Sequence, residues 1–66
     1  MTLAEYTKEV KDVFSKLAKR SQKDIDDYFN EPETIKYIKE GYSYYKNDGM
    51  PEAHPNAVAS CLDMMY

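Results

Sequence analysis

The residues best suited to nucleophilic chemistry in this sequence are a single thiol and a single imidazole, Cys61 and His54. A cysteine nucleophile needs a base within hydrogen-bond reach, and usually a third group that orients the base. A helix beginning at Pro55 would place the two side chains roughly 10 Å apart, and Cys61 shares an apolar, helically spaced run with Val58 and Leu62. We therefore expect that this protein is not an enzyme. Cys61 is predicted to be a small buried hydrophobic residue, and His54 a helix cap or an exposed loop residue.

The available metal ligands argue against a bound ion. Structural zinc takes four Cys or His ligands, and the chain has one of each, which leaves open only a site shared between two copies. A calcium loop starting at Asp24 would put Phe29 where glycine is required and Ile35 where glutamate is required. Acids are favourable at helix N-termini, and two predicted helix starts account for the acidic stretch: Asp24, Asp26, Asp27, Glu31 and Glu33. No metal or other cofactor is expected.

A cluster of cations stands where the first helix should end. Its members are Lys16, Lys19, Arg20 and Lys23. Cations suit the negative end of a helix, and the alternative is a patch that binds phosphate or an acidic partner. The net charge of -3 argues against a dedicated nucleic-acid binder, because such proteins gain affinity by neutralising phosphates.

Residues 24–40 have the superficial pattern of a helix-turn-helix, in which the second helix enters the major groove. Asp26 stands where that motif needs a small buried residue, and Pro32 lies in a turn that is about one residue short. The second helix would also offer a mixed set of side chains to an anionic duplex: Glu33, Lys36, Tyr37 and Glu40. A nucleic-acid-binding or regulatory domain that uses the basic cluster and Lys36 therefore remains the second hypothesis.

Tyrosine is the strongest compositional anomaly, with seven in 66 residues and no tryptophan. Tyrosine joins a large apolar ring to a hydroxyl that wants a partner, and it is enriched at interface hot spots. Four are predicted to cover the core with their hydroxyls in water: Tyr6, Tyr28, Tyr42 and Tyr45. Tyr37 and Tyr44 lie on a different helix face, and either pack under the last helix or form an exposed patch. Met50, Met64 and Met65 could extend such a patch, since methionine suits adaptable contacts.

Helical spacing predicts the elements that position these residues. Thr2 and Glu5 form a capping box for a first helix over about 2–20. Its apolar residues recur at steps of three and four: Leu3, Tyr6, Val10, Val13, Phe14 and Leu17. Ser21 can cap a short helix over about 22–29.

A third helix is predicted over about 31–47 and a fourth over about 55–66, with Gly49 as the stop between them. The main apolar stripe of the third helix is Ile35, Ile38, Tyr42 and Tyr45. Gly41 costs about 1 kcal/mol relative to alanine inside a helix, and close approach by another helix would explain it. The apolar C-terminus, 64–66, is expected to pack down.

The chain is expected to be one domain, 1–66, with an all-α fold of three main helices and the short one, because it shows no strand signal. A single cysteine, no signal-peptide stretch and no run of roughly 18 apolar residues predict a cytoplasmic protein with no membrane segment. Met1 favours a whole small protein. The leading hypothesis is a non-catalytic protein-interaction module, one that could self-associate, acting through a Tyr- and Met-rich surface around Tyr37, Tyr44 and Met65.

Overall fold

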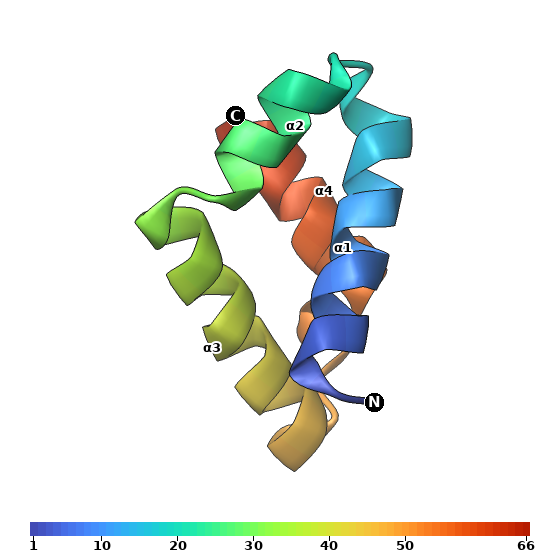
Figure 1. The fold of residues 1–66 in the computed structure, drawn as a ribbon. Coiled ribbons are helices and arrows are strands. Elements are labelled where there is room, and N and C mark those ends of the chain that lie inside the picture. The colour runs from blue at the N-terminus through green and yellow to red at the C-terminus, as the bar shows by residue number, and fades with distance from the viewer.

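The computed structural model describes residues 1–66 and contains helices and no strands (Figure 1), which confirms the predicted all-α bundle. Its elements are α1 (Leu3–Ala18), α2 (Gln22–Phe29), α3 (Pro32–Asp48), the 3-10 helix η1 (Pro51–Ala53) and α4 (Pro55–Met65). The bundle measures 33 × 19 × 19 Å. None of its helices combines the length and the apolarity needed to cross a bilayer.

Short polar signals set where the helices begin. The Thr2 hydroxyl accepts from the Glu5 amide at 3.1 Å, and the Glu5 carboxylate accepts from the Thr2 amide at 2.8 Å, so the predicted capping box forms. The Ser21 hydroxyl accepts from the Asp24 amide at 3.2 Å at the start of α2. These local bonds satisfy amides that the first turn of a helix leaves free.

The first helix is shorter than predicted and ends at Ala18 instead of near Arg20. Lys19 has φ 51° and ψ 46°, which is the left-handed conformation that ends many helices. This turn redirects the chain, so that Ser21 can start α2 at an angle to α1 (Figure 1).

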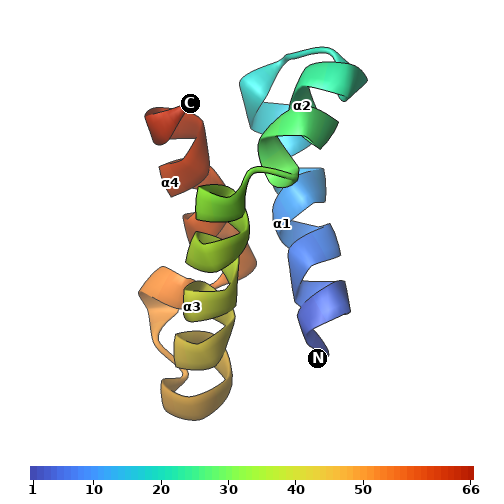
Figure 2. The same ribbon diagram turned by 60° about the vertical axis from the view of Figure 1, so that its left-hand side comes forward.

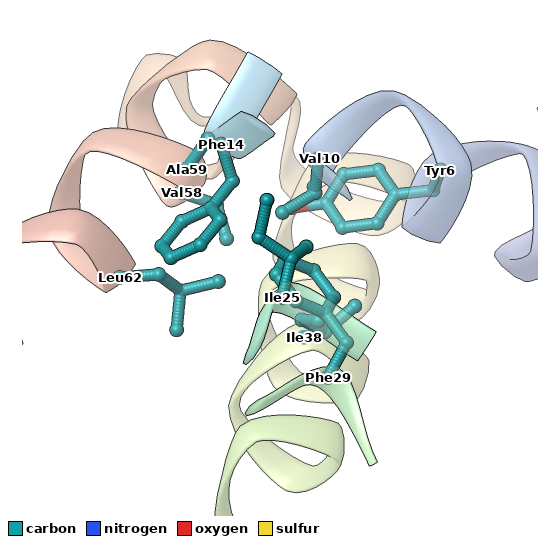
Figure 3. Packing of buried hydrophobic residues seen from close by; sticks show 9 residues of the cluster. All are labelled: Tyr6, Val10, Phe14, Ile25, Phe29, Ile38, Val58, Ala59 and Leu62. Carbon is teal, nitrogen blue, oxygen red and sulfur yellow. The ribbon is translucent and has the colours of Figure 1, made fainter. Parts of the chain in front are cut away.

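One apolar cluster holds all four helices together (Figure 3). Its buried residues are Tyr6, Val10, Phe14, Ile25, Phe29, Ile38, Val58, Ala59 and Leu62. The most extensive packing is between α1 and α4. Helices α3 and α4 run in opposite directions and are joined through η1 (Figure 2).

Helix α3 packs three residues of its predicted stripe against the core, Ile38, Tyr42 and Tyr45, but it is rotated so that the fourth, Ile35, is left exposed. Its buried residues are Thr34 and Ile38, whereas Ile35 is 38% exposed. At about 100° per residue the inner face runs through Thr34, Ile38 and Gly41. Thr34 and Gly41 are small enough for α3 to approach its neighbours closely along this line, and Ile35 is the one residue of the predicted stripe that lies outside the core.

Gly41 lies where α3 meets the side chains of two other helices. A Cβ at this position would stand 2.9 Å from the Tyr6 hydroxyl oxygen and 3.3 Å from Cγ2 of Val58. Tyr6 is fully buried, and its hydroxyl donates to the Ala53 carbonyl oxygen at 2.6 Å. The close approach predicted at Gly41 is therefore confirmed.

Tyrosine hydroxyls bond to distant backbone carbonyls, contrary to the expectation that they would reach water. Besides Tyr6, Tyr28 donates to the Leu62 carbonyl at 3.1 Å, and Tyr42 donates to the Met1 carbonyl at 2.6 Å. A hydroxyl withdrawn from water loses free energy unless it finds such a partner. These three bonds therefore connect α1, α2 and α3 to segments remote in sequence.

Gly41→Ala should destabilise the protein, although alanine is the better helix former. We expect the free energy of unfolding in urea to fall by about 1–2 kcal/mol, because the added methyl overpacks a site closed by a buried ring. In a Tyr6→Phe background the loss caused by Gly41→Ala should be at most half as large, since the nearest atom is gone. An additive double variant would contradict this account, and Ser43→Ala on the exposed side of α3 is the control.

Candidate functional site

His54 and Cys61 each have their own local partners. His54 caps α4, its Nδ1 accepting from the Asn56 amide at 3.2 Å, and its ring meets the edge of the Tyr45 ring with centroids 6.4 Å apart. Of the two roles predicted for His54, a helix cap or an exposed loop residue, the structure shows the cap. No group of three or more His, Cys, Asp or Glu side chains gathers closely enough to hold a metal ion.

Cys61 is exposed, so the prediction that it is buried is wrong. The buried face of α4 is formed by Pro55, Val58, Ala59 and Leu62. At about 100° per residue, Cys61 lies roughly 110° from the centre of that face. The thiol instead lies beside the hydroxyl of Tyr37 on α3.

The candidate site is a groove between α3 and α4 that consists of two hollows. The first hollow has a volume of about 300 Å³. Its lining residues are Tyr28, Glu31, Glu33, Thr34, Tyr37, Leu62 and Met65. It lies where the end of α2 and the start of α3 face the last turns of α4.

The second hollow continues the groove toward η1 and has a volume of about 190 Å³. Its lining residues are Tyr37, Glu40, Gly41, Tyr44, Met50, Glu52, Ala53 and Val58. Tyr37 lines both hollows, so they adjoin at this residue, and together they are called here the α3–α4 groove. Just over half of the lining residues of each hollow are hydrophobic, and the charged lining residues are all glutamates.

The structure brings the three predicted partner-binding residues to this groove. Tyr37 and Met65 line the first hollow, and Tyr37 and Tyr44 line the second. Tyr37 is half-buried against the core, whereas Tyr44 is 54% and Met65 58% exposed. The two alternatives, packing against the core or forming an exposed patch, therefore apply to different tyrosines: Tyr37 packs against the core, and Tyr44 is open to solvent.

Sequence reasoning missed the glutamates that line the groove. Glu33 and Glu40 lie on α3 at helical spacing from Tyr37 and Tyr44. That spacing places the acids beside the tyrosines on one side of the helix, whereas the sequence analysis attributes Glu33 to a helix start and Glu40 to a face of mixed charge. Glu52 comes from η1, which brings it to the groove from a segment that the sequence predicted as a loop.

Burial perturbs two tyrosines of the groove. Burial raises the pKa of Tyr28, and the negative charge of Glu31 adds to the effect. Burial also raises the pKa of Tyr37, with the neighbouring Cys61 thiol as the next cause. Both phenols therefore favour their neutral form, as does Tyr6 in the core, whose pKa burial raises to about 12.

The basic cluster lies outside this groove, at the turn between α1 and α2. Lys16, Lys19, Arg20 and Lys23 are all exposed there, and none lines either hollow. The Arg20 guanidinium stands over the Tyr66 ring, 4.0 Å from its centroid.

The C-terminus is packed down only in part. The Tyr66 ring contacts the Tyr28 ring, with centroids 4.6 Å apart. Met64, however, is 86% exposed on the outer side of α4, and Met65 is 58% exposed. The expectation that the whole apolar end packs against the bundle is therefore wrong for both methionines.

Cys61→Ser should change the free energy of unfolding by less than about 0.5 kcal/mol, because the exposed thiol contributes little to the core. Ala59→Ser, two positions earlier on the buried face, should cost about 1–3 kcal/mol because the added oxygen would overpack a fully buried position. Urea denaturation of both variants measures the difference. Equal losses would show that the thiol is buried after all.

Stability should fall in alkali. An unfolded tyrosine loses its proton near pH 10, whereas folded Tyr6 holds its proton to about pH 12. The unfolded chain therefore binds fewer protons between these values, and the free energy of unfolding should fall there by about 2–3 kcal/mol. Urea denaturation across this range should give a shallower decline for Tyr6→Phe, and an unchanged decline would contradict the assignment.

No known family model, curated protein or solved structure matches this chain. The α3–α4 groove and the surfaces around it are therefore the features of the molecule that bear on its function.

Proposed function

We propose that this protein is a non-catalytic interaction module that binds another protein through the α3–α4 groove. The observation that carries the proposal is a pair of adjoining hollows lined by tyrosine, methionine and aliphatic side chains. Binding sites of helical proteins are commonly grooves of this kind, into which a helix places its apolar face. Tyrosine and methionine suit the role, because tyrosine offers a rigid amphipathic ring and methionine an adaptable chain.

The exposure of the groove residues supports a contact role over a purely structural one. Tyr44 and Met65 are each more than half exposed, and Met50 is 39% exposed. Large apolar side chains left open in one continuous hollow mark interaction surfaces more often than scattered ones do. In a chain this short, the core is already supplied by the nine residues of the central cluster.

Self-association is the second form of the same proposal. A typical interface takes about 800 Å² from each partner, and the whole surface of this protein measures 4545 Å². A dimer would therefore need a large share of one side of the molecule, whereas a single helix needs only the groove. The concave shape favours the helix of another protein.

Nucleic-acid binding through the basic cluster gains little support. Arg20 is already engaged by the Tyr66 ring, and the net charge of -3 opposes contact with phosphates. A gel-shift experiment at about 50 mM salt, where phosphate contacts are strongest, discriminates between the two classes. A shift lost on replacing Lys16, Lys19 and Lys23 with glutamine would favour nucleic acid over the present proposal.

Two neighbouring methionines provide a matched test. Met65 lines the groove, whereas Met64 lies outside both hollows. Met65→Glu should abolish the capture of partners from a lysate of the native host and remove any dimer seen by sedimentation velocity. Met64→Glu should preserve both, and each variant should keep its stability within about 0.5 kcal/mol.

Equal behaviour of the two variants would count against the groove. So would a protein that stays monomeric at high micromolar concentration and captures nothing specifically. Tyr44→Glu tests the second hollow in the same way, and we expect it to behave like Met65→Glu.

A further inference from the structure

The glutamates of the α3–α4 groove indicate the chemistry of its occupant. We propose that the groove accepts one amphipathic helix of another protein, with Lys or Arg residues flanking apolar anchors. This inference rests on the proposed function and specifies its partner.

The charged residues that line the groove all have one sign. Both hollows combine an apolar floor with glutamates, and no Lys or Arg lines either of them. The four acids are Glu31, Glu33, Glu40 and Glu52. A complementary partner must therefore place cations beside its apolar face, since like charges at these positions would repel.

Most of the charges of α3 are divided between two sides of the helix. At about 100° per residue, the acids Glu33 and Glu40 share a stripe roughly 60° wide with Tyr37 and Tyr44. Of the lysines of α3, Lys39 and Lys46 lie roughly 130–150° from the centre of this stripe, whereas Lys36 lies only about 40° from Glu40. Helix α3 therefore presents its acids together with the tyrosines, and two of its three lysines on another side.

The groove acids have no partner within the protein. The one ion pair of the structure joins Lys11 and Asp26 at 2.6 Å. Glu31 and Glu33 benefit from the start of α3, but Glu40 stands in the middle of that helix, where its dipole gives no such benefit. The position at a helix start therefore explains Glu31 and Glu33 but not Glu40. All of these acids lack an ion-pair partner and remain available to a cationic partner.

The two hollows also set the spacing of the partner's anchors. Corresponding lining residues of α3, such as Thr34 and Gly41 or Tyr37 and Tyr44, are seven positions apart. Seven residues are about two helical turns, or roughly 10 Å. A helix lying along the groove would thus place one apolar side chain in each hollow from positions about seven residues apart.

A second copy of this chain fits these requirements poorly. Its own cations gather at the α1–α2 turn, where Lys19 has a left-handed backbone that interrupts the helix. The cluster therefore presents no continuous basic helix to another copy. The amphipathic face of α1 is already buried in the core through Tyr6, Val10 and Phe14.

Two synthetic helical peptides test the inference on the intact protein. Both carry leucine anchors about seven residues apart, with lysines at the flanking positions of one peptide and glutamates in the other. Binding is measured by fluorescence anisotropy and located by amide chemical-shift changes. We expect the lysine peptide to bind with shifts at Tyr37, Tyr44 and Met65, and the glutamate peptide to bind at least about tenfold more weakly.

Two charge-matched variants separate the groove from general attraction to an acidic protein. The groove variant is Glu33→Gln, Glu40→Gln and Glu52→Gln. The control variant removes three exposed acids that line neither hollow, Glu9→Gln, Asp12→Asn and Asp27→Asn. The groove variant should weaken the lysine peptide about tenfold at low salt, and the control variant less than about twofold.

Several results would overturn the inference. Equal weakening in both variants, or shifts confined to α1 and α2, would reduce the binding to unspecific charge attraction. Equal affinity for the two peptides would refute a partner with cationic flanks. If Met65→Glu still weakened the binding of both peptides, the proposed function would stand without the inference. A dimer abolished by Met65→Glu would make a second copy the occupant. If neither peptide binds and the Met64 and Met65 variants behave alike, the inference and the proposed function both fail.

Discussion

The hydrogen bond from the buried Tyr6 hydroxyl to the Ala53 carbonyl is the constraint on which the rest of the structure depends. It passes next to Gly41, which leaves room for the phenol between α1 and α3. Because Ala53 ends η1 and Pro55 begins α4, this one contact sets where α4 starts relative to both helices. The α3–α4 groove therefore follows from a core contact made by a helix that does not line it.

The groove also reflects how a short chain divides its aromatic residues. A domain this size exposes a large share of its surface, about 40% of what the unfolded chain exposes, so it cannot bury every ring. Tyr6, Tyr28 and Tyr42 place their hydroxyls on carbonyls and thereby become structural. Tyr44 is the most exposed ring of α3 and the one that we propose for contact with other molecules. Stability and the proposed recognition thus depend on different tyrosines of the same fold.

Sequence alone predicted the elements well because their signals are local. Capping at Thr2 and Ser21 concerns residues within a few positions, and the close approach at Gly41 follows from the cost of glycine in a helix. The rotation of α3 was not predictable in this way, since Ile35 and Thr34 compete for the inner face and only packing against α1 and α4 decides between them. The predicted burial of Cys61 was wrong for the same reason, because packing decides which face of α4 turns inward. Glu52 reaches the groove only because η1 brings it beside α3.

The exposed position of Cys61 has a practical consequence. It is the only sulfhydryl of the chain, and it lies beside Tyr37, the residue shared by both hollows. A maleimide dye or a photoreactive group attached there would sit at the edge of the proposed contact surface without any engineered substitution. The native chain thus carries its own attachment point for a reporter that senses, or covalently traps, whatever settles between α3 and α4.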